Sequence, residues 1–396
     1  MSKNATNAEL IQCGMQSGEL EECGTRNTET TTYIPNSEFR ILHWFHSALR
    51  TPHSSSSPFR IGKGGNALKH ILVVGGAGYI GSHTSKLLAK RGYVPVVLDN
   101  LVRGHRVAAK FGPFIEGSMT DTDLFHKILS DYPIWAVMHF AAFAYVGESM
   151  VNPAMYYKNN VANTLTLLEV MVERNINNFI FSSSCSIYGE PDETPITEDQ
   201  PKRPMSPYGR SKLMVEHILD DFEWAYGLKS VCLRYFNAAG ADSDGELGEE
   251  HDPETHLIPV VLKTALGKHP RVNIFGDDYP TPDGTGIRDY IHVEDLTEAH
   301  VLALERLLAG APSAKYNLGT ERGYSVKQVI ETAERIAGRE IPVKIIERRA
   351  GDPAVLIASS EKAKAELGWK AQKPDLETIM ESAWNWHRNH PDGYGS

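Results

Sequence analysis

Short apolar runs alternate with longer amphipathic segments from His70 onwards. The runs are bounded by glycine, asparagine, aspartate or serine and are too short for buried helices, so they predict buried strands. The segments between them are long enough for crossover helices, which predicts an α/β fold with a doubly wound parallel sheet of the Rossmann type. The predicted strands lie at residues 70–75 (HILVVG), 94–99 (VPVVLD), 135–142 (WAVMHFAA), 178–184 (NFIFSSS) and 229–236 (KSVCLRYF).

The pattern changes on both sides of this alternation. Residues 1–68 contain clusters of Thr, Ser and Asn without a sustained period, which predicts a disordered, low-complexity tail, with a misassigned start codon as the alternative. After Asn237 the apolar runs thin out into a Gly-, Asp- and Pro-rich stretch, which indicates a smaller mixed α/β lobe. We expect the domains to comprise residues 1–68 (tail), 69–240 (Rossmann domain, with 288–310 packing back on it) and 241–396 (mainly a substrate lobe).

Composition narrows the possible partners and compartment. The 396 residues are 41% apolar and 23% charged, as in a globular protein, and the net charge of −10 disfavours a nucleic-acid or anionic-membrane partner. The cysteines (Cys13, Cys23, Cys185 and Cys232) lie far apart without metal-ligand spacing, which predicts a reducing, cytoplasmic location and no metal site. The sequence has no apolar run long enough to predict a membrane span. Its N-terminus lacks the basic stretch followed by an apolar one that would predict a signal peptide.

Three glycines follow the first predicted strand in the spacing G-x-x-G-x-x-G, at Gly75, Gly78 and Gly81. Such a turn lets backbone amides approach a pyrophosphate, whose charge is stabilised by the N-terminus of the following helix. Asp99 ends the next predicted strand, where its carboxylate can bind the adenosine ribose hydroxyls and repel a 2′-phosphate. The order of strand, glycines, helix, strand and acid favours an NAD site over a purely structural turn, although Arg103 leaves NADP open.

Tyr208 and Lys212 lie four residues apart in the stretch SPYGRSK. If a helix begins near Pro207, about 3.6 residues per turn place both side chains on one face, where the ammonium can stabilise a tyrosine phenolate. Residues 182–184 are serines at the end of a predicted strand, on the side where ligands collect in a doubly wound sheet. On these residues alone, an ordinary helix start and a serine-rich strand end remain the alternative.

Further motifs extend from about Ile71 to Tyr394 and include both cofactor-side and substrate-side sequences. They are, in order, GGAGYIGSHT, LDNL, HFAA, VGES, YYKNN, FSSS, SPYGRSKLMVE, LRYFNAAGA, IFGDDYPTPDGTGIRDYIHV and RRAGD. In their order and spacing the chain resembles the UDP-glucose 4-epimerases, also called UDP-galactose 4-epimerases, of the extended short-chain dehydrogenase/reductase family.

This resemblance implies an isomerase that interconverts UDP-glucose and UDP-galactose with NAD as its cofactor. Tyr208 would remove the proton of the sugar 4-hydroxyl while hydride passes from C4 to NAD, and Ser184 would relay that proton. Lys212 would hold the nicotinamide ribose and lower the pKa of Tyr208. The 4-keto sugar would then turn over and take the hydride back on its other face. The resemblance also implies a homodimer.

Two sets of binding residues follow from the same resemblance. Those for NAD are Gly75, Gly78, Tyr79, Ile80, Gly81, Asp99, Asn100, Phe140, Ala141, Ala142, Asn160, Ser182, Tyr208, Lys212 and Tyr235. Those for the UDP-sugar are Ser184, Tyr208, Asn237, His256, Leu257, Phe275, Arg288, Arg349, Asp352 and Leu356. The two arginines would contact the UDP diphosphate and ribose, Asp352 a ribose hydroxyl and Phe275 the uracil, while Leu356 would form a wall of the sugar pocket.

Three residues depart from those common in the family: Ser118, Ala144 and His256 stand where many members have Asp, Lys and Asn. Because some members that act on UDP-pentoses carry an alanine like Ala144, a UDP-xylose/UDP-arabinose 4-epimerase is the alternative. A nucleotide-sugar 4,6-dehydratase is less favoured, since Cys185 and Ser186 occupy the place of the acidic pair that elimination needs. A non-catalytic NAD-binding sensor would not need the serine, tyrosine and lysine together.

Overall fold

Seven parallel strands form the main sheet of the computed structural model, which describes residues 68–349 and 352–395. Their order is β10-β6-β5-β4-β1-β2-β3, so the winding reverses between β1 and β4 and places a ligand crevice at the carboxyl ends of these strands. The strands are β1 (His70–Val74), β2 (Val94–Asp99), β3 (Phe114–Glu116), β4 (Ile134–His139), β5 (Asn178–Ser182), β6 (Lys229–Tyr235) and β10 (Ala314–Leu318).

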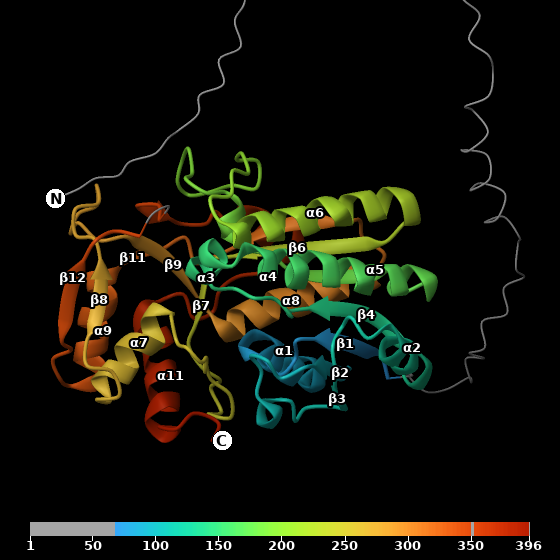
Figure 1. The fold of residues 1–396 in the computed structure, drawn as a ribbon, viewed down its shortest axis with the longest axis horizontal. Helices are drawn as coiled ribbons and strands as arrows, with labels where there is room; N and C mark the ends of the chain where they lie inside the picture. Colours follow the sequence, from blue (N-terminus) through green and yellow to red (C-terminus); the bar gives the residue numbers. More distant parts are fainter. Residues whose placement is uncertain (1–67, 350–351, 396) are drawn as a thin grey trace, which may run out of the picture. The chain divides into compact units, whose positions relative to one another are not determined.

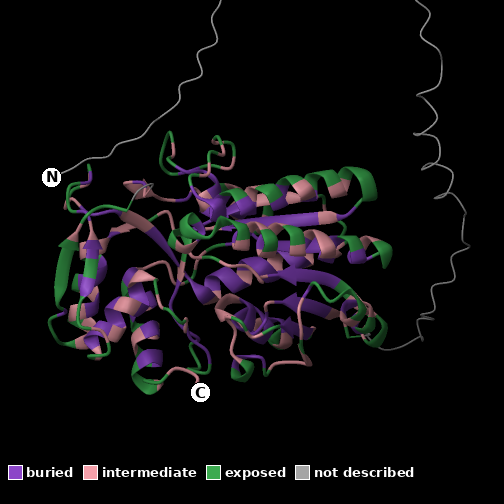
Figure 2. Ribbon diagram, viewed as in Figure 1, coloured by how far each residue is buried: buried purple, intermediate pink, exposed green. Residues whose placement is uncertain are grey.

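Helices cover both faces of this sheet (Figure 1). Successive residues of β1 enter opposite cores, because strand side chains alternate between the two faces: Ile71 and Val73 join one cluster, Leu72 and Val74 the other. Both sets are apolar, so the strand reads as a continuous apolar run, and Figure 2 shows the strands buried between half-exposed helices. One face carries α1 (Tyr79–Lys90) and α8 (Val293–Leu308); the other carries α2 (Thr122–Asp131), α5 (Asn163–Glu173) and α6 (Pro207–Tyr226).

The remaining elements form a smaller region with its own apolar core. One of its sheets has the order β11-β9-β13 with β7 paired to β9, and the other pairs β12 with β8. Its strands are β7 (Asn237–Ala239), β8 (Val272–Phe275), β9 (Ile287–His292), β11 (Gly323–Ser325), β12 (Val343–Ile346) and β13 (Val355–Leu356). Its helices are α7 (Leu257–Ala265), α9 (Val326–Ala337) and α11 (Leu376–Asn389), whereas α10 (Glu361–Leu367) packs on α8 and β10.

Several short helices lie near the carboxyl edge of the main sheet. After β4 the chain forms α3 (Val146–Val151), α4 (Pro153–Tyr156) and a π-helical turn, η2 (Tyr157–Ala162), which runs directly into α5. Two 3₁₀ turns, η1 (Arg106–Ala108) and η3 (Cys185–Ile187), follow β2 and β5. π-Helical turns are rare and occur frequently at functional sites.

The prediction of a doubly wound parallel sheet is confirmed, and all five predicted strands are present. Two further strands of the main sheet were not predicted, because β3 has only three residues and β10 carries polar Lys315 and Asn317 within its run. The predicted domain boundary at residue 240 stays a prediction. Helix α8, which lies beyond this boundary in the sequence, packs in the same apolar core as β1. Residues 1–67 of the predicted tail, with Cys13 and Cys23, lie outside the described residues. Among residues 68–349 and 352–395, no helix combines the length and apolarity that crossing a membrane requires.

Candidate active site

The turn after β1 is a tight glycine cradle. Gly75 has a φ of +80°, and a Cβ atom there would lie 2.5 Å from the backbone nitrogen of Ala141. A Cβ atom at Gly81 would lie 2.3 Å from the carbonyl oxygen of Gly75, so only glycine lets α1 pack against the turn this closely. Gly78 precedes α1 in an extended conformation and provides no side-chain cap, which leaves N–H groups at the helix start available to an anion. Tyr79 and Ile80 form the first turn of this helix.

Asp99 lies at the carboxyl end of β2 beside this turn and is buried. Its carboxylate accepts hydrogen bonds from the backbone N–H groups of Ala77 (2.9 Å) and Leu101 (2.8 Å). Burial raises the pKa of Asp99, and these two hydrogen bonds act in the opposite direction. The carboxylate retains lone pairs for further donors, which fits the two hydroxyls of a ribose. The adjacent Asn100 accepts from a backbone N–H of the same loop and shapes it.

Arg103 is directed away from Asp99. Its guanidinium donates to the Glu148 carboxylate (3.2 Å) and to the carbonyl oxygen of Asp252 (2.5 Å), and it lies 4.8 Å from the ring centroid of Tyr145. Binding a 2′-phosphate through Arg103 would therefore require these contacts to break. The glycine cradle, the open helix start and the unpaired carboxylate fit NAD.

The loop after β4 lies directly beside the glycine cradle. The N–H groups of Phe140 and Ala141 donate to the carbonyl oxygen of Val74, at 2.8 and 3.1 Å, and Ala142 follows. Asn160, on the π-helical turn η2, accepts from the N–H of Phe143 and donates to its carbonyl oxygen, both at 2.9 Å. This residue, predicted to contact NAD, therefore also fixes the backbone of the loop after β4.

The carboxyl end of β5 presents three serines with different partners. Ser182 hydrogen-bonds the hydroxyl of Tyr235, which ends the neighbouring β6, and Ser183 donates to Glu216 of α6 (2.6 Å). Ser184 caps the 3₁₀ turn η3 by accepting from the N–H of Ser186 (3.2 Å). The serine cluster therefore joins the end of β5 to β6, α6 and η3.

Helix α6 begins at Pro207 behind a serine cap, since Ser206 accepts from the N–H of Gly209 (3.1 Å). This start places Tyr208 and Lys212 one turn apart on a buried face, at 8% and 3% exposure. Lys212 Nζ lies 5.9 Å from the Tyr208 ring centroid and donates to the carbonyl oxygen of Ser182 (2.7 Å).

Burial is the main influence on the pKa values of Tyr208 and Lys212. Burial raises the pKa of Tyr208 to about 12, against a hydrogen bond from Ser184 that lowers it. Burial also lowers the pKa of Lys212 to about 7. Among the residues that the structure describes, its ammonium pairs with a backbone carbonyl and with no carboxylate. Desolvation is therefore the main cause of the raised Tyr208 pKa in the chain alone, and the lowering of this pKa by Lys212 stays a prediction.

A buried network that the sequence analysis missed supports the strand end. Glu216 is 1% exposed and accepts from Arg234 through Nε (2.9 Å) and Nη2 (2.6 Å), in addition to Ser183. Arg234 also donates to the hydroxyl of Tyr188 (2.8 Å). The signal was present, because Tyr208, Lys212 and Glu216 repeat every four residues along one helix face.

On the substrate side, the structure brings two pairs of predicted residues together. Arg288, on β9, forms an ion pair with Asp352 and has a side chain that is 14% exposed. The guanidinium of Arg349 stacks on the ring of Phe275, at the end of β8, with 3.6 Å between the cation and the ring centroid. A base could occupy the same stacking position, so Arg349 would move aside or extend the stack when UDP binds.

Leu356 pairs in register with Arg288 and packs in an apolar cluster with Cys185 and Phe236. It thus connects the substrate-side strands to the segment directly after Ser184. Asn237 begins β7, two residues beyond Tyr235, and is exposed.

His256 and Leu257 stand at the start of α7, but His256 Nδ1 faces two glutamates. It lies 3.1 Å from Glu249 and 3.0 Å from Glu254.

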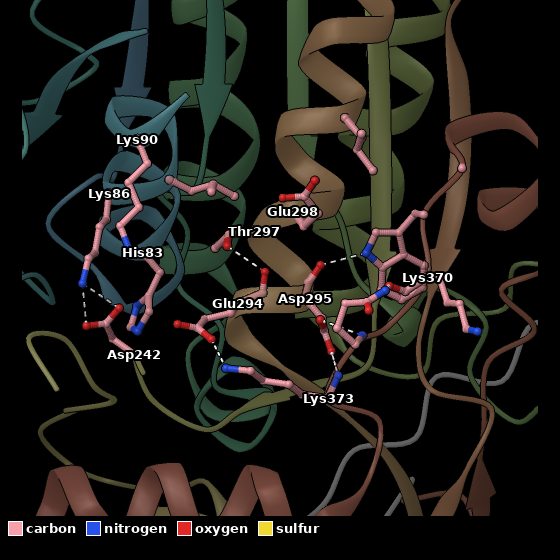
Figure 3. Close-up of a pocket in the computed structure, with 15 residues that line it drawn as sticks. His83, Lys86, Lys90, Asp242, Glu294, Asp295, Thr297, Glu298, Lys370 and Lys373 are labelled. Carbon is pink, nitrogen blue, oxygen red and sulfur yellow. Dashed lines mark hydrogen bonds and ion pairs between the residues drawn. The ribbon is translucent and has the colours of Figure 1, made fainter. Parts of the chain in front are cut away.

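A cavity of about 500 Å³ between α1 and α8 contains none of the predicted site residues (Figure 3). Its charged side chains pair with one another: Lys86 binds Asp242 (2.7 Å), and Lys373 binds Glu294. These pairs leave little uncompensated charge for a ligand. We therefore place the active site at the carboxyl edge of the main sheet.

Comparison with known proteins identifies the family of the chain. Residues 71–319 match the family described as "NAD dependent epimerase/dehydratase family". The UDP-glucose 4-epimerase of Halalkalibacterium halodurans is 52% identical over 326 residues, which cover 82% of this chain and 98% of that protein. The crystal structure of UDP-glucose 4-epimerase from Brucella ovis in complex with NAD is 51% identical, with a TM-score of 0.79 and coverage of 80% and 98%. The Bifidobacterium longum enzyme in complex with NAD+ and UDP is 41% identical, with a TM-score of 0.79 and coverage of 82% and 100%.

Proposed function

The chain belongs to the NAD dependent epimerase/dehydratase family, and we propose that it interconverts UDP-glucose and UDP-galactose by inverting C4 of the sugar. One observation carries the chemistry: Tyr208 and Lys212 are buried one helical turn apart on α6, at the carboxyl edge that also carries Ser184 and the glycine cradle. A general acid–base group, a proton relay and a cation thus lie where a doubly wound sheet binds its ligands.

In this proposal, the dinucleotide binds at the carboxyl ends of β1, β2 and β4. The helix start after Gly78 holds the pyrophosphate, Asp99 the adenosine ribose, and Lys212 the nicotinamide ribose. NAD, when bound, supplies a hydride acceptor and donor for C4 of the sugar. Because epimerisation involves no net oxidation, the nucleotide need not be exchanged between turnovers.

Tyr208 takes the proton of the sugar 4-hydroxyl, with Ser184 hydrogen-bonded to the same oxygen. A pKa near 12 makes the tyrosine a weak base at neutral pH, so the site must stabilise its phenolate during the reaction. The amine of Lys212 can do so in its protonated form, at about 1.4 kcal/mol for each unit by which it lowers the Tyr208 pKa. After the 4-keto sugar turns over, C4 takes the hydride back on its other face, and Tyr208 returns the proton to the 4-oxygen.

The nucleotide of the substrate is held by the second region of the chain. Arg288 and Arg349 bind the diphosphate and ribose, since a guanidinium can donate two parallel hydrogen bonds to phosphate oxygens. Asp352 then exchanges part of its ion pair with Arg288 for a ribose hydroxyl. Phe275 stacks on the uracil, and Leu356 faces the sugar.

UDP-xylose and UDP-arabinose remain the second substrate candidates, on the evidence of Ala144, which is an exposed residue of the loop between β4 and α3. Elimination by a 4,6-dehydratase is disfavoured, because burial raises the pKa of Cys185 to about 12 and makes this thiol a poor acid and base at neutral pH.

We also propose a homodimer in the cytoplasm. Trp224 and Tyr226 on α6 are 91% and 56% exposed, which is unusual for large apolar side chains and fits a covered surface in an assembly. Cys185 and Cys232 are free and buried, as suits a reducing compartment.

The test is product analysis with the purified full-length chain and no added nucleotide. UDP-galactose should convert to UDP-glucose, and to a smaller extent the pentose pair should interconvert, as resolved by chromatography and mass spectrometry. Exclusive turnover of the pentoses would establish the alternative, and a product that has lost water would establish a dehydratase. The Tyr208→Phe chain is the matched control for contaminating activity.

A further inference from the structure

Residues 240–256 connect β7 to α7 without a helix or strand, yet several of their side chains are buried. Within this connection, Glu249, His251, Glu254 and His256 direct one potential ligand atom each toward a common point. All four atoms lie within 4.8 Å of one another. The spacing of the cysteines predicted no metal site, and no cysteine contributes to this cluster.

We propose that these four residues form a binding site for one divalent transition-metal ion of the zinc type, which orders the connection between the two regions of the chain. Two imidazole nitrogens and two carboxylates are a ligand set that such ions prefer, whereas Mg²⁺ prefers oxygen ligands alone.

The distances between the ligand atoms support four-coordinate binding. His256 Nδ1 lies 3.1 Å from Glu249 Oε1. His251 Nδ1 lies 3.4 Å from the same oxygen and 3.7 Å from Glu254 Oε2. In a tetrahedral zinc site with bonds of about 2.0–2.1 Å, neighbouring ligand atoms are about 3.3 Å apart. The side chains therefore need only small shifts to bind an ion.

Two buried atoms in the cluster point independently to a ligand. Glu254 has a side chain that is 2% exposed, and its Oε2 atom forms no hydrogen bond to any residue that the structure describes. His251 Nδ1 is likewise buried without a hydrogen-bond partner among these residues. Unsatisfied buried polar atoms are costly and uncommon, and a metal ion would satisfy both.

The other oxygen of Glu254 is already oriented. It accepts hydrogen bonds from the backbone N–H groups of Thr255 and His256, both at 2.9 Å. Such bonds to a ligating carboxylate fix its direction, as outer contacts do in known metal sites. The side chain of His256 is 38% exposed and leaves an access route for the ion.

The position of the site gives the ion a structural role. The ring of His251 lies 6.5 Å from that of Tyr79 in the first turn of α1, and the ring of His256 lies 5.9 Å from that of Tyr145. Tyr79 also donates to the carbonyl oxygen of Gly240, where the connection begins (2.7 Å). An ion bound by four residues of this connection would hold it against the nucleotide-binding turn.

Protons are the competitors of the metal. Metal ions bind deprotonated ligands, so the imidazoles of His251 and His256 must be neutral when an ion is bound. Lys263 Nζ lies 3.9 Å from Glu254 Oε2 and is a further cation at the cluster. Metal binding must therefore displace protons and weaken as the pH falls.

The experiment is calorimetric titration of the chelator-treated, tag-free full-length chain with ZnCl₂, and with MgCl₂ for comparison, at a pH slightly above neutrality. We expect one equivalent of Zn²⁺ to bind with a Kd below about 1 µM, and Mg²⁺ not to bind at this site. Glu254→Gln and His251→Gln should each weaken Zn²⁺ binding at least about a hundredfold, whereas His217→Gln, at an exposed histidine of α6, should bind as the unmodified chain does.

Absence of one-equivalent binding by the unmodified chain, or binding that survives both cluster substitutions, overturns the proposal. Circular dichroism reports whether the variants fold. If they do not, Co²⁺ absorption of the unmodified chain decides: a tetrahedral spectrum with nitrogen and oxygen ligands supports the site, and any other spectrum overturns it.

Discussion

Lys212 donates a hydrogen bond from Nζ to the carbonyl oxygen of Ser182, across 2.7 Å, where β5 ends. The bond directs the amine of α6 toward the edge of the sheet beside the three serines. Because the partner is a neutral carbonyl group, it compensates only part of the cost of burying an ammonium ion.

Substituting Lys212 by Met should change how the stability of the nucleotide-free chain depends on pH. Burial lowers the pKa of Lys212 to about 7 in the folded chain, against about 10.4 when unfolded. Between these values the unfolded chain binds more protons, so Lys212 makes stability rise with pH across this window, by a few kcal/mol at most. In the Lys212→Met chain, the unfolding free energy should not contain this pH-dependent contribution.

The measurement is urea denaturation of both chains at several pH values from about 6 to 10. The difference in unfolding free energy between them should change steadily across the window, whatever its absolute value. A constant difference would show that Lys212 keeps an ordinary pKa.

Tyr208→Phe should reduce epimerisation at least about a hundredfold while leaving bound NAD in place, because only the hydroxyl is lost. Turnover of UDP-galactose and nucleotide content per chain are measured on the same preparation. Retention of more than about a tenth of normal turnover, a barrier change under about 1.4 kcal/mol, would contradict the role of Tyr208 as general base. Tyr226→Phe, at the exposed end of the same helix, is the matched control.

The purified chain should carry NAD rather than NADP, and Asp99→Asn should carry much less of it. The amide that replaces the carboxylate would place an NH₂ group near the N–H groups of Ala77 and Leu101, and the bond to the ribose would weaken. The nucleotide released by denaturation is identified by enzymatic assay, with the exposed Asp221→Asn as control. Recovery of mainly NADP would mean that Arg103 leaves Glu148 to bind a phosphate.

Leu356 should make the enzyme prefer UDP-galactose to UDP-N-acetylgalactosamine. An acetamido group pressed against this side chain would lose a hydrogen bond to water, at a cost of about 1 to 3 kcal/mol, and Leu356→Gly should narrow the gap in kcat/KM. Val355→Gly is the matched control: it also places a glycine in β13, but it removes a side chain from the opposite face of the strand. Equal kcat/KM values for the two sugars in the unmodified chain would show that Leu356 is not the wall.

The sequence by itself determined the main sheet and the order of the candidate site residues along it, because these depend on local patterns. Apolar runs of strand length specify buried parallel strands. Glycine at positions 75 and 81 specifies the tight turn, because a Cβ atom at either position would clash with the neighbouring backbone. The four-residue spacing of Tyr208 and Lys212 likewise fixed their shared helix face.

Only the tertiary structure decided the environment of those groups. The lowered pKa of Lys212 and the raised pKa of Tyr208 result from burial by segments distant in the chain, which the spacing of the two residues does not contain. The contact of Arg103 with Glu148 and the support of Ser183 by Glu216 also join residues far apart in sequence. Their strength depends on distance and desolvation in the folded chain, and neither quantity can be obtained from the order of residues alone.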